Sequence, residues 1–262
     1  MDTLVLKLVL TPTLIGTASL AGRRWGPAVS GWLVGFPFTS APVALFLALN
    51  EGVAFAATAA AGTMAGTISQ AVFSVAYGWL ARRVAWPLCV AGSCVAFALS
   101  TLILRHLSLP LLPLFLVVVV SLVVALRLMP IPDARRRASP TAVPRWDIAA
   151  RMIVATAFVL LLTGIAGFLG PELTGLLSPF PLYAGILAAF GHHFHGPQAA
   201  IAVLRGLILG LFAFGGFFLT LSALIERAGI GLAFAAAIAV ALLIQAGALW
   251  TLHRGPSAPG RA

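Results

Sequence analysis

The sequence predicts an all-α polytopic membrane protein, and three observations support that fold class. Of its residues 61% are hydrophobic and only 8% are charged, with a mean hydropathy of +1.08, whereas a soluble domain carries about 25% charged residues. The apolar runs are long enough to cross a bilayer core about 30 Å thick, which takes about 20 residues per helix. A repeated pattern, described below, divides the chain into two similar halves. No separate soluble domain fits within 262 residues.

Runs of apolar residues separated by Arg, Gly, Pro or His predict about nine transmembrane helices. The expected spans cover residues 3–20, 28–49, 52–81, 84–104, 108–129, 147–169, 172–191, 197–225 and 229–252. We expect the first to be an uncleaved span, because Lys7 lies within it and no basic segment precedes it. Cys89 and Cys94 lie within one span and favour neither a disulfide nor a zinc site.

The charge distribution predicts the orientation of the chain. The formal net charge is +10, which in a soluble chain would suggest nucleic acid, but in a membrane protein Arg in short loops marks the cytoplasmic side. By the predicted topology, 12 of the basic residues fall on one side and 3 on the other. We therefore expect a multi-pass protein with its N-terminus outside and its C-terminus in the cytoplasm, surrounded by membrane lipids and without a nucleic-acid partner.

An internal repeat appears when the chain is shifted by 144 residues. Residues 26–80 and 170–224 then match at 14 of 55 positions without a gap, and the matches include five Gly and two Pro residues. Gly and Pro matches are harder to obtain by chance than matches between common apolar residues. The pattern predicts a first membrane repeat (1–106), a connector helix with a basic cytoplasmic linker (107–146) and a second membrane repeat (147–262).

The unpaired connector sets the relative direction of the two repeats. Equivalent helices lie five crossings apart and would therefore run in opposite directions, so the sequence predicts two inverted four-helix repeats joined by a connector helix. Inverted repeats that enclose a site near the bilayer midplane are typical of secondary transporters. If spans 172–191 and 28–49 were re-entrant hairpins, the halves would be parallel instead.

The repeated core, G-P-x-x-[ST]-G-x-L-x-x-F-P, interrupts the second helix of each repeat at Phe36-Pro37 and Phe180-Pro181. Both interruptions are expected near mid-membrane, where free backbone groups are tolerated only inside protein or beside a wet cavity. Hydroxyl residues near each break resemble helix starts, whose free amides favour anions. The alternative is that Pro and Gly merely kink two helices for packing. The candidate substrate-binding residues are Phe36, Pro37, Thr39, Ser40, Ser178, Phe180, Pro181 and Arg205.

Arg205 belongs to this set because it lies inside an apolar helix, where a buried cation is costly unless paired. It would reinforce selection for an anion, although it could also extend toward the cytoplasmic head groups. Gln70 and Tyr77 are weaker polar candidates, and the glycines of the G-x-x-x-G pairs 62/66 and 206/210 suggest close helix packing.

Other reactive groups do not form a recognisable catalytic or metal site. His192, His193 and His195 form an H-H-x-H cluster without a nearby Cys, Asp or Glu, so metal binding and pH sensing are both conceivable. Glu51, Glu172 and Glu226 fall at expected helix ends. No hydrolase, protease or nucleotide-binding motif occurs, so we expect neither an enzyme nor a cofactor.

The segments 30–37 and 174–181 resemble the second helix of the small four-span GlpM-type bacterial inner-membrane proteins. The resemblance rests on a short Gly, Phe and Pro pattern in each half. It implies a fused pair of GlpM-like units in a bacterial inner membrane. It brings no established activity or substrate.

Two hypotheses for function follow. The first is a small inner-membrane transporter that moves an anionic or zwitterionic small molecule or a lipid head group, with a channel as its nearest variant. The alternative is an accessory or assembly membrane protein that binds a partner or lipid and transports nothing. The sequence leaves open whether the chain forms a homo-oligomer.

Overall fold

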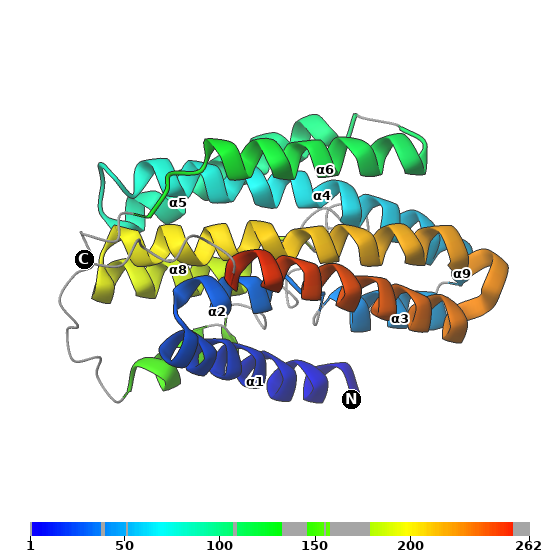
Figure 1. The fold of residues 1–262 in the computed structure, drawn as a ribbon. Coiled ribbons are helices and arrows are strands. Elements are labelled where there is room, and N and C mark those ends of the chain that lie inside the picture. The colour runs from blue at the N-terminus through cyan, green and yellow to red at the C-terminus, as the bar shows by residue number, and fades with distance from the viewer. Residues whose placement is uncertain are drawn as a thin grey trace.

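The structure is a computed structural model that describes residues 2–37, 40–50, 52–106, 109–132, 146–154, 156–157 and 179–253, and in this part of the chain it is helical without strands. The helices lie roughly along one direction (Figure 1). Their bounds are α1 Asp2–Trp25, α2 Pro27–Val34, α3 Ser40–Asn50, α4 Val53–Leu80, α5 Trp86–Leu104, α6 Leu111–Leu128, α8 Leu182–His195 and α9 Pro197–His253. A short helical segment also covers residues 147–154.

Glycines in a left-handed backbone conformation separate consecutive helices. Gly26, Gly52, Gly196 and Gly229 have φ values of 101°, 93°, 79° and 76°, a region that is strained for residues with a side chain. Proline follows Gly26 and Gly196 at the first helical position, where its missing N–H is tolerated. Gly229 divides α9 into two limbs, as expected from the spans 197–225 and 229–252.

Among the described residues, three helices are long and apolar enough to cross a membrane. They are Trp86–Leu104, Leu111–Leu128 and the stretch Pro197–Gly247 of α9. Their outward faces carry exposed Leu, Ile and Val side chains, including Ile103, Leu112 and Leu243, as helices in contact with lipid do. The described part of the chain is thus all-helical, with helices that fit the length and composition of membrane spans.

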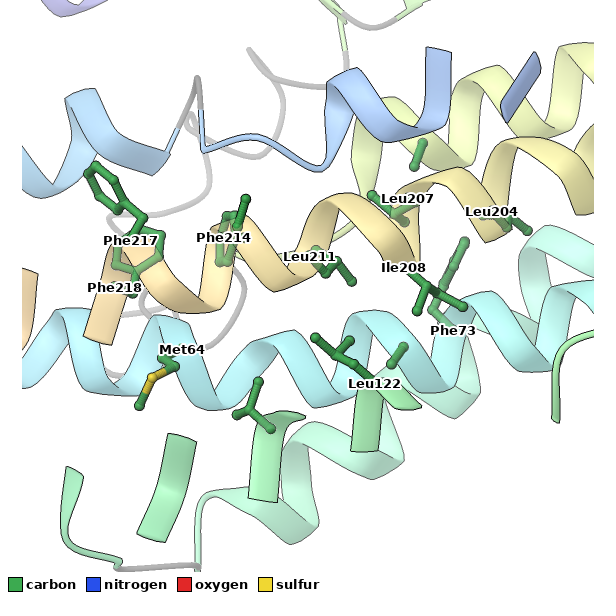
Figure 2. Packing of buried hydrophobic residues seen from close by; sticks show 14 of the residues in the cluster. Met64, Phe73, Leu122, Leu204, Leu207, Ile208, Leu211, Phe214, Phe217 and Phe218 are labelled. Carbon is green, nitrogen blue, oxygen red and sulfur yellow. The ribbon is translucent and has the colours of Figure 1, made fainter. Parts of the chain in front are cut away.

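The core forms around α4 and the first limb of α9, which run antiparallel. Figure 2 shows Met64 of α4 beside Phe218 of α9, and Phe73 nearer to Ile208. Ser222 Oγ donates a hydrogen bond to the carbonyl of Ala57 at 2.9 Å, so the start of α4 lies beside the end of the first limb of α9. α6 packs against both helices, and α2 and α8 pack against α9. This central pair therefore positions every element that contributes to the site described next.

Candidate substrate site at two helix breaks

The first break separates α2 from α3. α2 ends at Val34, residues 35–37 are not helical, and α3 begins at Ser40, so the interruption predicted at Phe36-Pro37 is present. The amide of Phe36 turns back to the carbonyl of Leu33 at 3.1 Å. The carbonyl of Trp32 instead accepts a hydrogen bond from Gln245 Nε2 at 2.9 Å. A side chain from the second limb of α9 thus satisfies a backbone group near the end of α2.

The second break precedes α8. Pro179, Phe180 and Pro181 are not helical, and α8 begins at Leu182. The ring of Phe180 meets the edges of Phe73 and Phe97, with centroid distances of 6.2 and 5.3 Å. Pro179 and Pro181 are themselves buried. The predicted positions Thr39 and Ser178, and the helix expected before this break, lie outside the described residues.

Each break packs directly against a glycine of the central helix pair. A Cβ atom added to Gly35 would lie 2.5 Å from the Cα of Gly210 on α9, and one added to Gly66 of α4 would lie 2.9 Å from the Cβ of Pro179. Real Cβ atoms do not approach so closely, so both contacts require glycine. At the repeat offset of 144, position 35 corresponds to position 179 and position 66 corresponds to position 210. The contact of Gly35 with Gly210 therefore has its counterpart in the contact of Pro179 with Gly66.

The two breaks lie at nearly the same level along the central pair. Gly66 follows Ala57 by nine residues and Gly210 precedes Ser222 by twelve, and Ala57 and Ser222 are hydrogen bonded. At a rise of 1.5 Å per residue these glycines lie about 14 and about 18 Å from that bond. The levels of the breaks therefore differ by only about 5 Å.

A cavity of about 260 Å³ leads toward the second break. Its lining comes from α4, from the end of α5 and from the start of α6: Thr58, Ala61, Gly62, Ala65, Gly66, Ser69, Thr101, Leu104, Arg105, Leu109 and Leu114. Arg105 is exposed, whereas Ser69 and Thr101 are buried and joined by a hydrogen bond of 2.9 Å. The cavity thus runs from a basic group at the end of α5 to Gly66, which contacts Pro179.

Arg205, predicted to bind substrate, lies at the C-terminal end of α6. Its guanidinium donates hydrogen bonds to the carbonyls of Leu126 and Met129 at 3.2 and 2.9 Å. Trp79 Nε1 donates to Leu128 in the same turn at 2.9 Å. The last carbonyls of a helix have no partner within it and favour cations. Arg205 and Trp79 therefore stabilise the C-terminal end of α6, and we leave Arg205 out of the substrate site proposed below.

The opposite end of the molecule from Arg105, which we call the arginine-rich end, holds Arg23, Arg82, Arg83 and Arg151. There the buried carboxylate of Asp147 accepts from Arg151 Nε at 3.0 Å and from Arg23 at 3.2 Å. Arg151 also lies over the ring of Phe190, 5.1 Å from its centroid. These contacts join α1, segment 147–154 and α8.

The three histidines of the H-H-x-H cluster reach different elements at the arginine-rich end. His192 Nδ1 lies 3.5 Å from the hydroxyl of Tyr77, and the ring of His193 lies 6.0 Å from that of Trp86. Burial, followed by the positive charge of Arg151, lowers the pKa of His195. Among the described residues no group of three metal-binding side chains occurs. The cluster therefore supports helix packing here.

Five buried polar atoms among the described residues have no hydrogen-bond partner. They are Ser19 Oγ, Trp32 Nε1, Thr67 Oγ1, Gln70 Oε1 and Gln245 Oε1. The sequence had suggested Gln70 as a weak candidate, but Gln245 was missed. Its signal is a lone amide in an otherwise apolar limb, which becomes meaningful only once the fold places it beside Trp32.

Comparison of the chain with protein-family models, with curated proteins and with solved structures found no match. The resemblance to GlpM-type units therefore stays a prediction.

Proposed function

We propose that the chain is a small multi-pass transporter of the bacterial inner membrane, with a substrate site near the bilayer midplane for an anionic or zwitterionic small molecule or a lipid head group. The observation that carries the proposal is the pair of break contacts, Gly35 with Gly210 and Pro179 with Gly66. Secondary transporters typically bind their substrates where interrupted helices meet near the midplane, and the end of α2 and the start of α8 lie at nearly one level along the central pair.

Two inverted repeats account for these paired contacts. The offset of 144 relates α3 to α8, α4 to the first limb of α9, and α5 to the second limb. The antiparallel course of α4 and the first limb of α9 supports inversion, because equivalent helices must then run in opposite directions. On this proposal α6 is the connector, and the chain crosses the membrane about nine times with its N-terminus outside.

The two ends of the molecule differ in their contacts. Arg105 lines the cavity, while at the arginine-rich end Asp147 pairs with two arginines and Tyr77 contacts His192. The positive-inside rule assigns the arginine-rich end to the cytoplasm. On this proposal the cavity belongs to the outer side of the protein, and transport would expose the site to the two sides in turn by moving one repeat against the other.

The expected charge of the substrate follows from a group that lines the cavity. Arg105 lines the cavity, and its positive charge favours a negative group on the substrate. An anionic or zwitterionic molecule fits this feature.

The proposal is tested by uptake into proteoliposomes. We expect concentrative, partner-ion-dependent uptake, and its loss in Pro37→Ala and Pro181→Ala, because alanine permits a straighter helix at each break. Pro113→Ala is the matched control, since Pro113 is exposed in the first turn of α6. Ohmic single-channel current would exclude a carrier and identify the protein as a channel. Full function in both break variants would favour the accessory-protein hypothesis.

Topology is tested separately by cysteine accessibility. Single cysteines at Arg23 and His193 should react from the cytoplasmic side, and cysteines at Glu51 and Glu172 from the outside; both glutamates lie outside the described residues. If positions 51 and 172 reacted from opposite sides, the two repeats would not be inverted and the proposal would fail.

A further inference from the structure

Each break lies beside one buried glutamine whose amide oxygen has no partner among the described residues. The two side chains are Gln70 of α4 and Gln245 of the second limb of α9, with exposed fractions of 7% and 5%. A buried polar atom that loses its hydrogen bonds to water costs free energy unless another group replaces them. Two such atoms, one at each break, suggest that a ligand supplies the missing donors.

Gln245 is held in place at the first break. Its Nε2 donates to the carbonyl of Trp32, which fixes the amide so that Oε1 is the remaining acceptor. The indole N–H of Trp32 is also buried and unpaired in the described part of the chain. The first break therefore presents one free acceptor and one free donor, a combination that matches a molecule carrying both kinds of group.

Gln70 lies on the face of α4 that meets the second break. Gly66, Phe73 and Tyr77 contact Pro179, Phe180 and His192, respectively. Residues 66, 70, 73 and 77 form one stripe of an α-helix, which places Gln70 on the same side of α4 as Pro179 and Phe180. Gly66 and Ser69 also line the cavity that includes Arg105. Gln70 thus follows directly in the chain on a residue that lines this cavity.

We propose that Gln70 and Gln245 form the hydrogen-bond-accepting half of the substrate site and that the substrate is a zwitterion with a primary ammonium group. This inference rests on the proposed function and narrows its substrate class. The amide oxygens accept from the ammonium N–H groups, while the buried and unpaired indole N–H of Trp32 donates to the anionic half. Neutral amide oxygens suit this role because they add no charge to the site. The ammonium group is then balanced by the anionic group of the same substrate molecule.

The proposal makes a chemical distinction between two kinds of head group. A primary ammonium offers three N–H donors, whereas a trimethylammonium group has the same charge and no donor. A site that binds its substrate through hydrogen bonds discriminates strongly against an analogue that lacks the donor. An apolar pocket that recognises only shape discriminates far less. Phosphoethanolamine and phosphocholine form one matched pair of probes, and glycine and glycine betaine form a second.

Equilibrium binding to the purified full-length protein tests the inference without requiring transport. Binding is followed by the shift of the thermal unfolding midpoint with probe concentration. We expect the primary-ammonium member of at least one pair to bind at least about tenfold more tightly than its trimethyl partner. Nanodiscs of phosphatidylethanolamine or phosphatidylcholine separate a lipid head group from a free solute, since a lipid substrate would stabilise the protein only in the former.

The variant Gln70→Leu should remove this preference while leaving the fold intact, because leucine fills the space and needs no hydrogen bond. Ser93→Ala is the control: Ser93 is also buried, but its hydroxyl already donates to the carbonyl of Cys89 within α5 at 2.6 Å. Its selectivity should equal that of the original protein. Gln245→Leu also strips the Trp32 carbonyl of its donor, so Gln70→Leu is the decisive variant.

Three results would overturn the inference. They are equal affinity for both members of each pair, no binding of any probe, and stabilisation by Na⁺ alone that disappears in Gln70→Leu, which would identify a cation site instead. The proposed function fails differently. Selective binding without any uptake would support the ammonium site but reject the proposed transport function. Uptake without selectivity would reject only the ammonium site.

Discussion

Replacing Gly210 with alanine tests whether α2 and α9 meet through their backbones. A Cβ atom at Gly210 would lie 2.6 Å from the carbonyl oxygen of Trp32 and 2.7 Å from the Cα of Gly35. Both neighbours are backbone atoms, so neither can rotate away as a flexible side chain would. To restore an ordinary contact of 3.4 Å, the two helices must separate by about 0.8 Å, and this shift also strains the hydrogen bond from Gln245 to Trp32.

The expected cost follows from overpacking in a well-packed interior. Inserting one methyl group where the backbone must move costs about 1–3 kcal/mol, or a lowering of the unfolding temperature by about 2–12 °C for a chain of this size. The free energy of unfolding is measured by SDS titration of the purified protein, followed by tryptophan fluorescence. Trp32 lies at the contact, so its emission also reports on separation of the helices.

Two comparisons make this experiment decisive. Gly231→Ala is the control, because a Cβ there meets nothing within 4 Å, and its stability should be unchanged or slightly increased by the better helix propensity of alanine. The double variant Gly35→Ala/Gly210→Ala should cost less than the sum of the two single changes, since one separation accommodates both methyl groups. A cost below about 0.5 kcal/mol for Gly210→Ala, or strict additivity, would refute close backbone packing.

Three further predictions concern the polar contacts. Arg205→Lys should cost about 1.5–3 kcal/mol, because an ammonium on a single stem cannot reproduce both hydrogen bonds to α6, and hydrogen exchange should rise at residues 125–129; unchanged exchange there would contradict the anchoring role. Asp147→Asn should cost about 3–5 kcal/mol, since it leaves the buried Arg151 uncompensated, whereas loss of the half-exposed partner in Arg23→Gln should cost about 0–1 kcal/mol; equal costs in chemical unfolding would contradict this ranking. Because burial and Arg151 lower the pKa of His195, the unfolded chain binds more protons than the folded one, so stability should be full above pH 6.5 and fall as the pH drops below it; His195→Asn should flatten this decline between pH 7 and 5, and an unchanged slope would exclude His195 as its source.

Local rules were sufficient to predict several of the helices and the first break. Apolar run length predicted where α5, α6 and both limbs of α9 lie, and Pro37 with Gly35 predicted where α2 must stop, because proline cannot donate the next helical hydrogen bond. The kink at Gly229 also agrees with the boundary expected between two spans. These features depend on residues adjacent in sequence, which is why the sequence reveals them.

The partners of buried polar groups could not be predicted in the same way. Arg205 was expected in the substrate site, yet its partners are carbonyls of α6 more than 70 residues away. Asp147 marked only the start of a span in the sequence, and its pairing with Arg23 depends on where α1 docks. Such contacts are set by helix packing across the whole chain, about which spacing and hydropathy carry little information.

The differences between the two repeats indicate which parts would move. The glycines that contact the breaks are kept in both halves, but Arg205 replaces Ala61 at the offset of 144, and its guanidinium holds the end of α6. Trp79 of α4 binds the same turn of α6, so the connector is fixed to both central helices at the arginine-rich end. At the breaks, by contrast, the contacts are made by glycine and proline. On the proposed function, α4, α6 and the first limb of α9 would therefore form the fixed frame, and the segments that follow the breaks, α3 and α8, would shift against it as the two ends of the molecule open in turn.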